Sequence, residues 1–347
     1  YVTVESGFYE DTLEVRILSN MFESTIHYSL DGTPPDTTSP VYDGPLTIDS
    51  TVVLRARAFV EGYLPGEMVT KTYFINEDVD LPVFSISMDP YLLWDWEEGM
   101  YVKGPDAAST FPFYGANFWN DWERPAHAEY FNDNHEKVVS QPVGLKIHGS
   151  VTRAYDQKSL RLNARGIYGD SRMRYKFFPG KKDSTYKKLV LRNSGQDFNK
   201  SHFRDGLMNK MVQNKTHIDN MAYKPTVVFL NGQYWGIHNM REKIGKWYVG
   251  DNHPEVDFEN MDLLVDNFIT IEGDYVHYWH MIDFLEHTMV FGEQDYDSLQ
   301  QLLDIKNYTD YFIAEMYYCN VDWPNNNIKY WREKEEGSRW RYIMYDL

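Results

Sequence analysis

Hydrophobic and polar residues alternate in short runs over the first 78 residues. The clearest runs are 13–18, 25–30 and 52–58, and clusters of Asp, Gly and Pro such as 31–35 separate them. Alternation with a period of two is typical of half-buried strands, and Gly and Pro are typical of tight turns. We therefore predict a small all-β, immunoglobulin-like sandwich over residues 1–78.

The pattern becomes mixed after a polar linker near residues 76–80. The expected strands are 143–149, 158–162 and 189–192, with a hairpin of 226–230 and 233–238 around Asn231-Gly232 and a second hairpin of 328–331 and 340–345. The expected helices are 201–214 with Ser201 as N-cap, 275–291, 297–303 and 307–318. Since strands come first, helices follow and no βαβ repeat occurs, residues 79–347 are expected to form an α+β domain.

The charge balance excludes several classes of protein. The chain has 34 Lys+Arg and 52 Asp+Glu, so its net charge is 34 − 52 = −18. A nucleic-acid binder needs a basic surface, and an anionic membrane attracts basic proteins, so we expect neither partner. The apolar runs are too short to span a bilayer. Aromatic residues reach 16%, which indicates either core packing or exposed sugar-binding platforms.

Cys319 is the one cysteine, so no intrachain disulfide can form. This fits a reducing compartment or a bacterial surface protein without disulfides. No signal peptide is visible, and the sequence opens at Tyr1 in mid-pattern and stops at Leu347 after a strand-like run. We expect a piece of a longer protein.

A polar loop carries the strongest candidate chemistry. Asp322 and Asn327 are five residues apart in the loop after the last predicted helix, and Asp346 follows the next hairpin, nineteen residues on. Protein kinases use this order: an Asp that orients the acceptor hydroxyl, an Asn that holds Mg²⁺ and a second Asp that holds the metals. No His-Arg pair precedes Asp322, and a turn with Asx hydrogen bonds is the alternative.

Phosphate-binding candidates precede this loop. Gly149 lies in a predicted turn that could cover ATP phosphates, and Lys158 is the preferred cation, with Arg161, Lys146 and Arg153 as alternatives. A plain hairpin turn and solvated edge residues are the competing interpretations. Two further ATP-binding candidates are Arg204, beside Asp205 on the helix predicted at 201–214, and Glu242, where a kinase hinge would hold adenine. A surface ion pair and an exposed strand-end charge are their alternatives.

Residues 1–78 resemble the β-sandwich appended to chitobiases and β-hexosaminidases. The resembling stretches are 25–35, 39–42, 44–46 and 54–58. That module accompanies many extracellular bacterial proteins, so the resemblance implies a secreted context, with cell-surface glycan as a partner to consider.

Residues 80–347 resemble the CotH family, named for a spore-coat protein. The resembling stretches are 81–86, 149–150, 158–162, 191–197, 203–205, 230–236, 241–242, 322–324, 326–327, 340–342 and 345–346. The resemblance implies a two-lobed atypical protein kinase that uses ATP with Mg²⁺, or Mn²⁺ in its place, to phosphorylate Ser/Thr of partner proteins. Asp322 then matches the catalytic Asp, and Asn327 and Asp346 match metal ligands. The family continues past Asp346, so the C-terminal part of the helical lobe is expected to lie beyond Leu347.

Two other functions remain open at this stage. A structural or adhesive surface protein could use a kinase-like scaffold without chemistry. A polysaccharide-active protein would use paired carboxylates, for which Asp95, Glu97 and Glu98 are candidates. We expect an extracellular or surface protein of bacterial origin.

Overall fold

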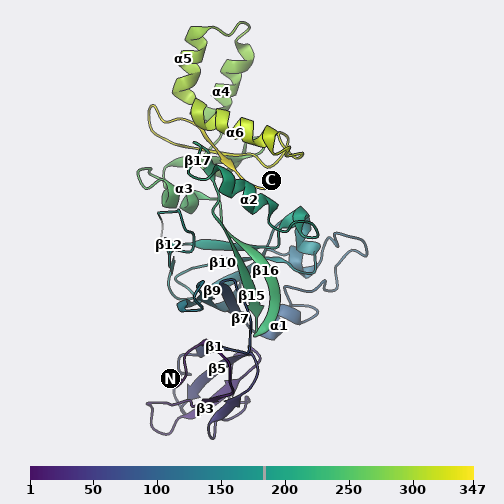
Figure 1. Cartoon of the computed structure of the whole chain (residues 1–347), viewed down its shortest axis with the longest axis vertical. Coiled ribbons are helices and arrows are strands. Elements are labelled where there is room, and N and C mark those ends of the chain that lie inside the picture. Colours follow the sequence, from purple (N-terminus) through teal and green to yellow (C-terminus); the bar gives the residue numbers. More distant parts are fainter. Residues whose placement is uncertain (183–184) are drawn as a thin grey trace. The chain divides into compact units, whose positions relative to one another are not determined.

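The computed structural model describes residues 1–182 and 185–347, and it forms two compact units (Figure 1). The first unit comprises Tyr1–Tyr175, Thr185–Gln196 and Pro225–Met240. The second comprises Asp197–Lys224 and Arg241–Leu347, together with residues 176–182. Among the described residues, no helix is both long and apolar enough to cross a membrane.

The first 75 residues form the predicted β-sandwich. One sheet has the order β1-β6-β5-β3, and β2 pairs with β4 in the other. The strands are β1 (Gly7–Tyr9), β2 (Leu13–Val15), β3 (Thr25–Ser29), β4 (Leu46–Ile48), β5 (Val52–Phe59) and β6 (Val69–Ile75). Inward-facing residues such as Val15, Leu54 and Tyr73 are fully buried in one core, so the alternating pattern correctly predicts an all-β element.

A closed barrel of seven strands follows, in the order β10-β13-β16-β15-β7-β8-β9. Its strands are β7 (Val83–Ser87), β8 (Arg124–Phe131), β9 (Lys137–His148), β10 (Ser159–Asn163), β13 (Lys188–Arg192), β15 (Tyr223–Leu230) and β16 (Gln233–Glu242). The predicted pairing of β9 with β10 and the predicted hairpin of β15 and β16 are both confirmed. Asn231 and Gly232 have φ values of 50° and 79°, which the tight turn between β15 and β16 requires.

Shorter elements complete the first unit. They are α1 (Pro90–Trp94), β11 (Met173–Arg174), β12 (Thr185–Tyr186) and the 3₁₀ turns Asn117–Trp119, Val151–Ala154 and Gly195–Asp197, the last of which ends at the first residue of the second unit. The helix α1 has Asp89 as N-cap, whose side chain accepts from the backbone N–H of Tyr91.

Aromatic side chains join the sandwich to the barrel within the first unit. Phe74 of β6 lies 5.3 Å from Phe131 of β8 and 4.8 Å from Phe229 of β15, measured between ring centroids. All three are buried. The buried guanidinium of Arg55 in β5 donates to the backbone oxygen of Ser87 at the end of β7. The two β elements therefore share a packed interface.

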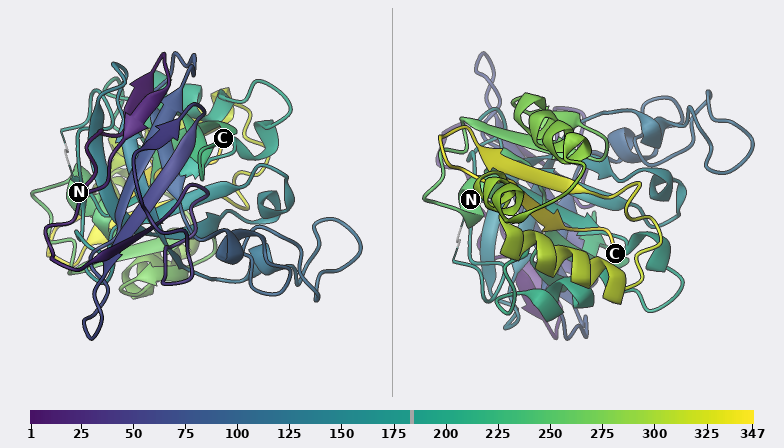
Figure 2. Two further views of the ribbon diagram at one scale, coloured as in Figure 1. Left: turned by 90° about the horizontal axis from the view of Figure 1, so that it is seen from below. Right: turned by 90° about the horizontal axis from the view of Figure 1, so that it is seen from above.

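The second unit has a five-stranded sheet of order β14-β20-β19-β17-β18. Its elements are α2 (Arg204–Val212), β14 (Asp219–Asn220), α3 (Lys246–Asn252), β17 (Met261–Val265), β18 (Ile269–Glu272), α4 (Val276–His287), α5 (Glu293–Leu302), α6 (Ile305–Tyr317), β19 (Lys329–Glu333) and β20 (Arg341–Met344). The helix α6 packs on this sheet (Figure 2), and its residues Tyr311 and Ala314 share a core with Tyr342 and Met344 of β20. The predicted hairpin of β19 and β20 is confirmed.

Several helix boundaries differ from the prediction. The predicted N-cap Ser201 instead donates its hydroxyl to Asp197, and α2 begins three residues later at Arg204. The helix predicted to reach 291 ends at His287, and an exposed turn with Met289 and Val290 leads into α5. At the start of α2, the hydrogen bond from Ser201 to the Asp197 side chain thus overrides the apolar periodicity.

Candidate functional site

The loop after α6 carries Asp322 and Asn327. Cys319 has a φ of 52°, in the left-handed region, and there the chain leaves the helix. The backbone N–H of Asn326 then donates to the carbonyl oxygen of Asp322 at 3.0 Å, which closes a turn. Both Asp322 and Asn327 are half-buried. Their side chains therefore lie on a folded loop and are not fully solvated.

The structure brings Asn327 next to Asp346. Asp346 follows β20, and the side-chain N–H of Asn327 donates to its backbone oxygen at 3.4 Å. The next backbone N–H, of Leu347, donates to Asp205 of α2 at 3.3 Å. Asn327 and Asp346 meet because β19 and β20 pair as antiparallel strands. This pairing brings the chain after β20 back to the point where the loop ends and β19 begins.

The donor set around this loop suits a hard cation that also binds phosphate. The described residues contain no cluster of three His, Cys, Asp or Glu able to hold a metal ion by themselves. Two carboxylates and one amide oxygen are what Mg²⁺ takes when substrate phosphates supply its other ligands. Asp322, Asn327 and Asp346 fit that requirement.

The predicted phosphate-binding residues lie in the first unit. Gly149 has a φ of 104°, and its carbonyl oxygen accepts from the guanidinium of Arg153 at 2.6 Å. Lys146 and Arg161 are directly opposite each other on β9 and β10. Exposed Asp121 forms an ion pair with Lys146, and together with Arg161 this lysine lowers the pKa of Asp121. Three of the basic candidates, Lys146, Arg153 and Arg161, thus lie around one carboxylate.

The preferred lysine has a different environment. Lys158 is buried, and its ammonium donates to the backbone oxygens of Arg153 and Tyr155 at 2.8 and 2.9 Å. It also lies 4.0 Å from the ring centroid of Phe118. Burial lowers the pKa of Lys158 to about 8. Lys158 therefore fixes the backbone that follows the Gly149 turn, and a direct contact with ATP stays a prediction.

The two remaining ATP-binding candidates lie in the second unit. Arg204 is the first residue of α2, and its backbone N–H donates to Asp197 at 3.0 Å. Glu242 is buried and accepts from the backbone N–H of Ala222 at 2.6 Å. It also forms an ion pair with Lys181 at 3.2 Å. Glu242 is thus a paired interior carboxylate, and its contact with adenine stays a prediction.

Arg241 and Asp205 form a buried ion pair near Asp346 that the sequence did not predict. Arg241 is 1% exposed and pairs with Asp205, which also accepts from Leu347. The guanidinium of Arg241 donates to the backbone oxygen of Ala222 at 3.0 Å. The motifs around both residues were visible, but only the fold brings α2 and β16 together. The pair holds the end of β20 in place.

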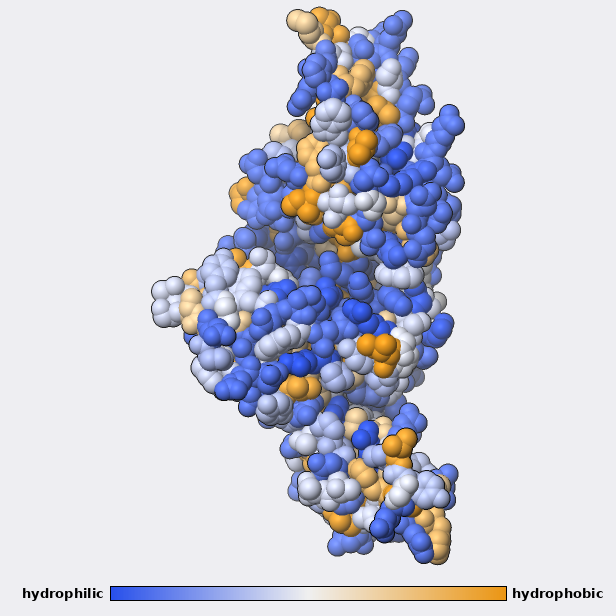
Figure 3. All heavy atoms as spheres, turned by 180° about the vertical axis from the view of Figure 1, so that it is seen from behind, coloured by the Kyte–Doolittle hydropathy of each residue, from blue (hydrophilic) through white to orange (hydrophobic). Residues whose placement is uncertain are grey.

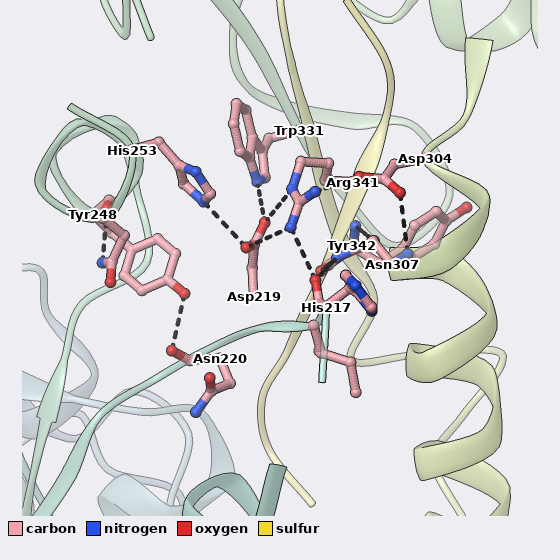
Figure 4. Close-up of polar contacts among 12 residues, drawn as sticks. His217, Asp219, Asn220, Tyr248, His253, Asp304, Asn307, Trp331, Arg341 and Tyr342 are labelled. Carbon is pink, nitrogen blue, oxygen red and sulfur yellow. Dashed lines mark hydrogen bonds and ion pairs between the residues drawn. The ribbon is translucent and has the colours of Figure 1, made fainter. Parts of the chain in front are cut away.

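Asp219 organises a second polar cluster that the sequence did not indicate (Figure 4). Its carboxylate accepts from His253 at 3.1 Å, Trp331 at 2.9 Å and Arg341 at 3.0 Å. Burial opposes ionisation, but the hydrogen bonds from His253 and Arg341 outweigh it and lower the pKa of Asp219 to about 2. A pocket of about 290 Å³ borders Asp219, His253 and Arg341 but not Asp322, Asn327 or Asp346.

Comparison with known proteins gives two family matches. Residues 145–347, more than half of the chain, match the family described as CotH kinase protein. Residues 4–70 match the family described as chitobiase/beta-hexosaminidase C-terminal domain. No curated protein matches the chain. The two matches fall on the α+β part of the chain and on the N-terminal sandwich, in the order that the sequence predicts.

Proposed function

The chain belongs to the CotH kinase family, and from this premise we propose that it transfers the γ-phosphate of ATP to Ser or Thr of a partner protein. The observation that carries the proposal is the juxtaposition of Asn327 and Asp346 through a 3.4 Å hydrogen bond, with Asp322 on the same loop. A metal-dependent phosphoryl transferase needs these three groups next to one another.

Each of these residues has one task in the proposed reaction. Asp322 accepts a hydrogen bond from the acceptor hydroxyl and orients it for in-line attack. Asn327 and Asp346 hold Mg²⁺ through hard oxygen ligands. ATP with its metal supplies the phosphoryl group and the positive charge that offsets the charge developing on it.

The residues proposed to form the nucleotide site, by direct contact or by holding its backbone, are Gly149, Lys158, Arg161, Arg204 and Glu242. Arg161 is the candidate cation with an unpartnered donor, because its buried Nε has no hydrogen-bond partner in the described chain. Lys158 contributes by holding the carbonyl oxygens of Arg153 and Tyr155, which follow the turn at Gly149. Arg161 and Lys158 are therefore assigned different tasks.

The cellular setting is also a proposal. The CotH and chitobiase-type domains together support a secreted or surface protein, bacterial in origin and related to the spore coat, and the chitobiase-type domain hints at carbohydrate association. A pocket of about 260 Å³ in the sandwich, lined in part by Leu18, Met21 and Arg57, is the specific feature that favours a glycan-binding role beside the kinase role. Titration of chitin oligosaccharides against the protein tests that role.

Transfer of label from γ-labelled ATP to a Ser/Thr peptide library tests the kinase proposal. The wild-type protein should label the library in the presence of Mg²⁺ or Mn²⁺, and Asp322→Asn should reduce the rate about 100-fold or more. The exposed-residue variant Gln294→Ala is the matched control. Equal labelling by Asp322→Asn and wild-type protein would exclude Asp322 from the reaction.

A further inference from the structure

A buried glutamate lies at the base of the loop that carries Asp322. Glu315 is in the last turn of α6 and is 1% exposed. Its carboxyl Oε2 accepts from the side-chain N–H of Asn320 at 2.8 Å, and its backbone oxygen accepts from the backbone N–H of Asn320 at 3.2 Å. Glu315 therefore accepts two hydrogen bonds from Asn320, one at its side chain and one at its backbone oxygen.

Asn320 in turn bonds to the backbone of Asp322. The side-chain oxygen of Asn320 accepts from the backbone N–H of Asp322 at 3.3 Å. One amide side chain thus connects the buried carboxyl of Glu315 to the backbone of Asp322. An Asn that bonds to the backbone two residues on fixes the local turn. The side chain of Asp322 takes its direction from that turn.

Glu315 is a buried carboxyl with two side-chain neighbours. Burial raises the pKa of Glu315, while interactions with the side chains of Asn320 and Tyr311 oppose that shift. A buried carboxyl destabilises a fold unless polar partners satisfy it. Tyr311 lies on the same helix, so Asn320 is the partner that connects Glu315 to the loop of Asp322.

We infer that Glu315 is a positioning residue for Asp322, acting through the side chain of Asn320 to hold the loop in the conformation that presents Asp322 to its substrate. The expected effect of Glu315 on the reaction rate rests on the proposed kinase function. The hydrogen-bonded link from Glu315 through Asn320 to Asp322 does not depend on that function. Glu315 itself need not touch either substrate.

Two substitutions at Glu315 separate positioning from simple stability. Glu315→Gln keeps the shape of the side chain and an oxygen that accepts from Asn320, so kcat should stay within about threefold of wild type. Glu315→Leu removes the acceptor while filling a similar volume, so kcat should fall about 100-fold with the KM for ATP nearly unchanged. Asn320→Ala should reproduce this loss, and the double variant with Glu315→Leu should lose no more.

The matched control is Glu129→Leu. Glu129 is also 1% exposed, burial also raises its pKa, and it lies on β8 in the other unit. Glu129→Leu should change the melting temperature while leaving kcat intact. Equal losses of kcat in Glu129→Leu and Glu315→Leu would show a general loss of fold and overturn the inference.

Amide hydrogen exchange of peptides covering 318–328 gives a readout without activity. Glu315→Leu and Asn320→Ala should each speed exchange there about tenfold or more, and Glu315→Gln and Glu129→Leu should not. Unchanged exchange in Glu315→Leu would overturn the inference whether or not the wild-type protein is a kinase. Faster exchange in a protein that transfers no phosphate would instead leave the link in place and contradict the kinase proposal.

Discussion

Several polar side chains in this protein form hydrogen bonds with backbone groups of distant residues. Lys158 holds two carbonyl oxygens, Glu242 accepts from a backbone N–H, and Asn307 joins α6 to the backbone of β20. A sequence reveals residue types but not these partners. The sequence predicts Lys158 as a phosphate contact, and it gives no sign that the ammonium also donates to two backbone oxygens.

Arg161 and Lys158 should respond differently in an ATP titration. Arg161→Met removes a cation that has an unpartnered donor, so ATP should bind about tenfold more weakly or worse. Lys158→Met removes backbone contacts, so it should mainly lower thermal stability. Calorimetry of both variants checks this, with thermal unfolding as control. A larger loss of ATP affinity for Lys158→Met than for Arg161→Met would reverse the two assignments.

The stability contributed by Asp219 should depend on pH. Its pKa is about 2 in the folded protein and about 3.9 in an unfolded chain, so the folded state favours the charged form. The contribution, about 2 kcal/mol, is present above pH 4 and is lost as the pH falls from about 4 to about 2. Denaturant unfolding should show the gap between wild type and Asp219→Asn shrinking over that window. A gap that stays constant down to pH 2 would contradict the assignment.

At the scale of elements, the hairpin turn signals predicted the structure correctly, whereas helix ends and distant strand pairings were not predicted. The hairpin at Asn231-Gly232 was predicted because its turn chemistry is contained in two residues. The parallel pairing of β7 with β15 was not predicted, because Val83 and Val227 are partners 144 positions apart and leave no local trace. The closed barrel depends on that pairing. The polar cluster of Asp219 was missed for the same reason.

Asn307 should be the residue that fixes α6 against the sheet. Its side chain accepts from the backbone N–H of Tyr342 at 2.7 Å and donates to the backbone oxygens of His217 and Tyr342. Asn307→Ala leaves buried backbone groups without partners, so the free energy of unfolding should fall by about 3 kcal/mol. Gln294→Ala on exposed α5 is the control and should stay within about 0.5 kcal/mol. Similar values for the two variants would mean that Asn307 does not anchor α6.

At the scale of the molecule, the candidate site was partly predictable. Order and spacing predict a site of Asp322, Asn327 and Asp346, and the fold places Asn327 against Asp346. The positions of the basic residues could not be predicted from the sequence, because strand pairing decides which of them face a common point.

The −18 net charge agrees with a surface that is mostly hydrophilic on the face drawn in Figure 3. The N-terminal sandwich packs on the barrel through the aromatic cluster of Phe74, Phe131 and Phe229.

The sandwich and the barrel should therefore unfold together. Phe74→Ala opens a cavity in their shared core and should lower the free energy of unfolding by about 3–5 kcal/mol. Probes in both elements should report the same transition, before and after the substitution. Val15→Ala, inside the sandwich core, should likewise shift the transition that probes in both elements report. Two separate transitions in the wild-type protein would contradict the coupling.

The most direct measurement is calorimetric titration of ATP, with and without Mg²⁺, into the wild-type chain and into Asp346→Ala. The expected result is binding that needs Mg²⁺ and weakens about tenfold or more in Asp346→Ala, because that carboxylate is a proposed metal ligand. Thermal unfolding of both proteins checks that the variant is folded. Binding of ATP that is equally strong without metal, or unchanged in folded Asp346→Ala, would contradict the kinase proposal.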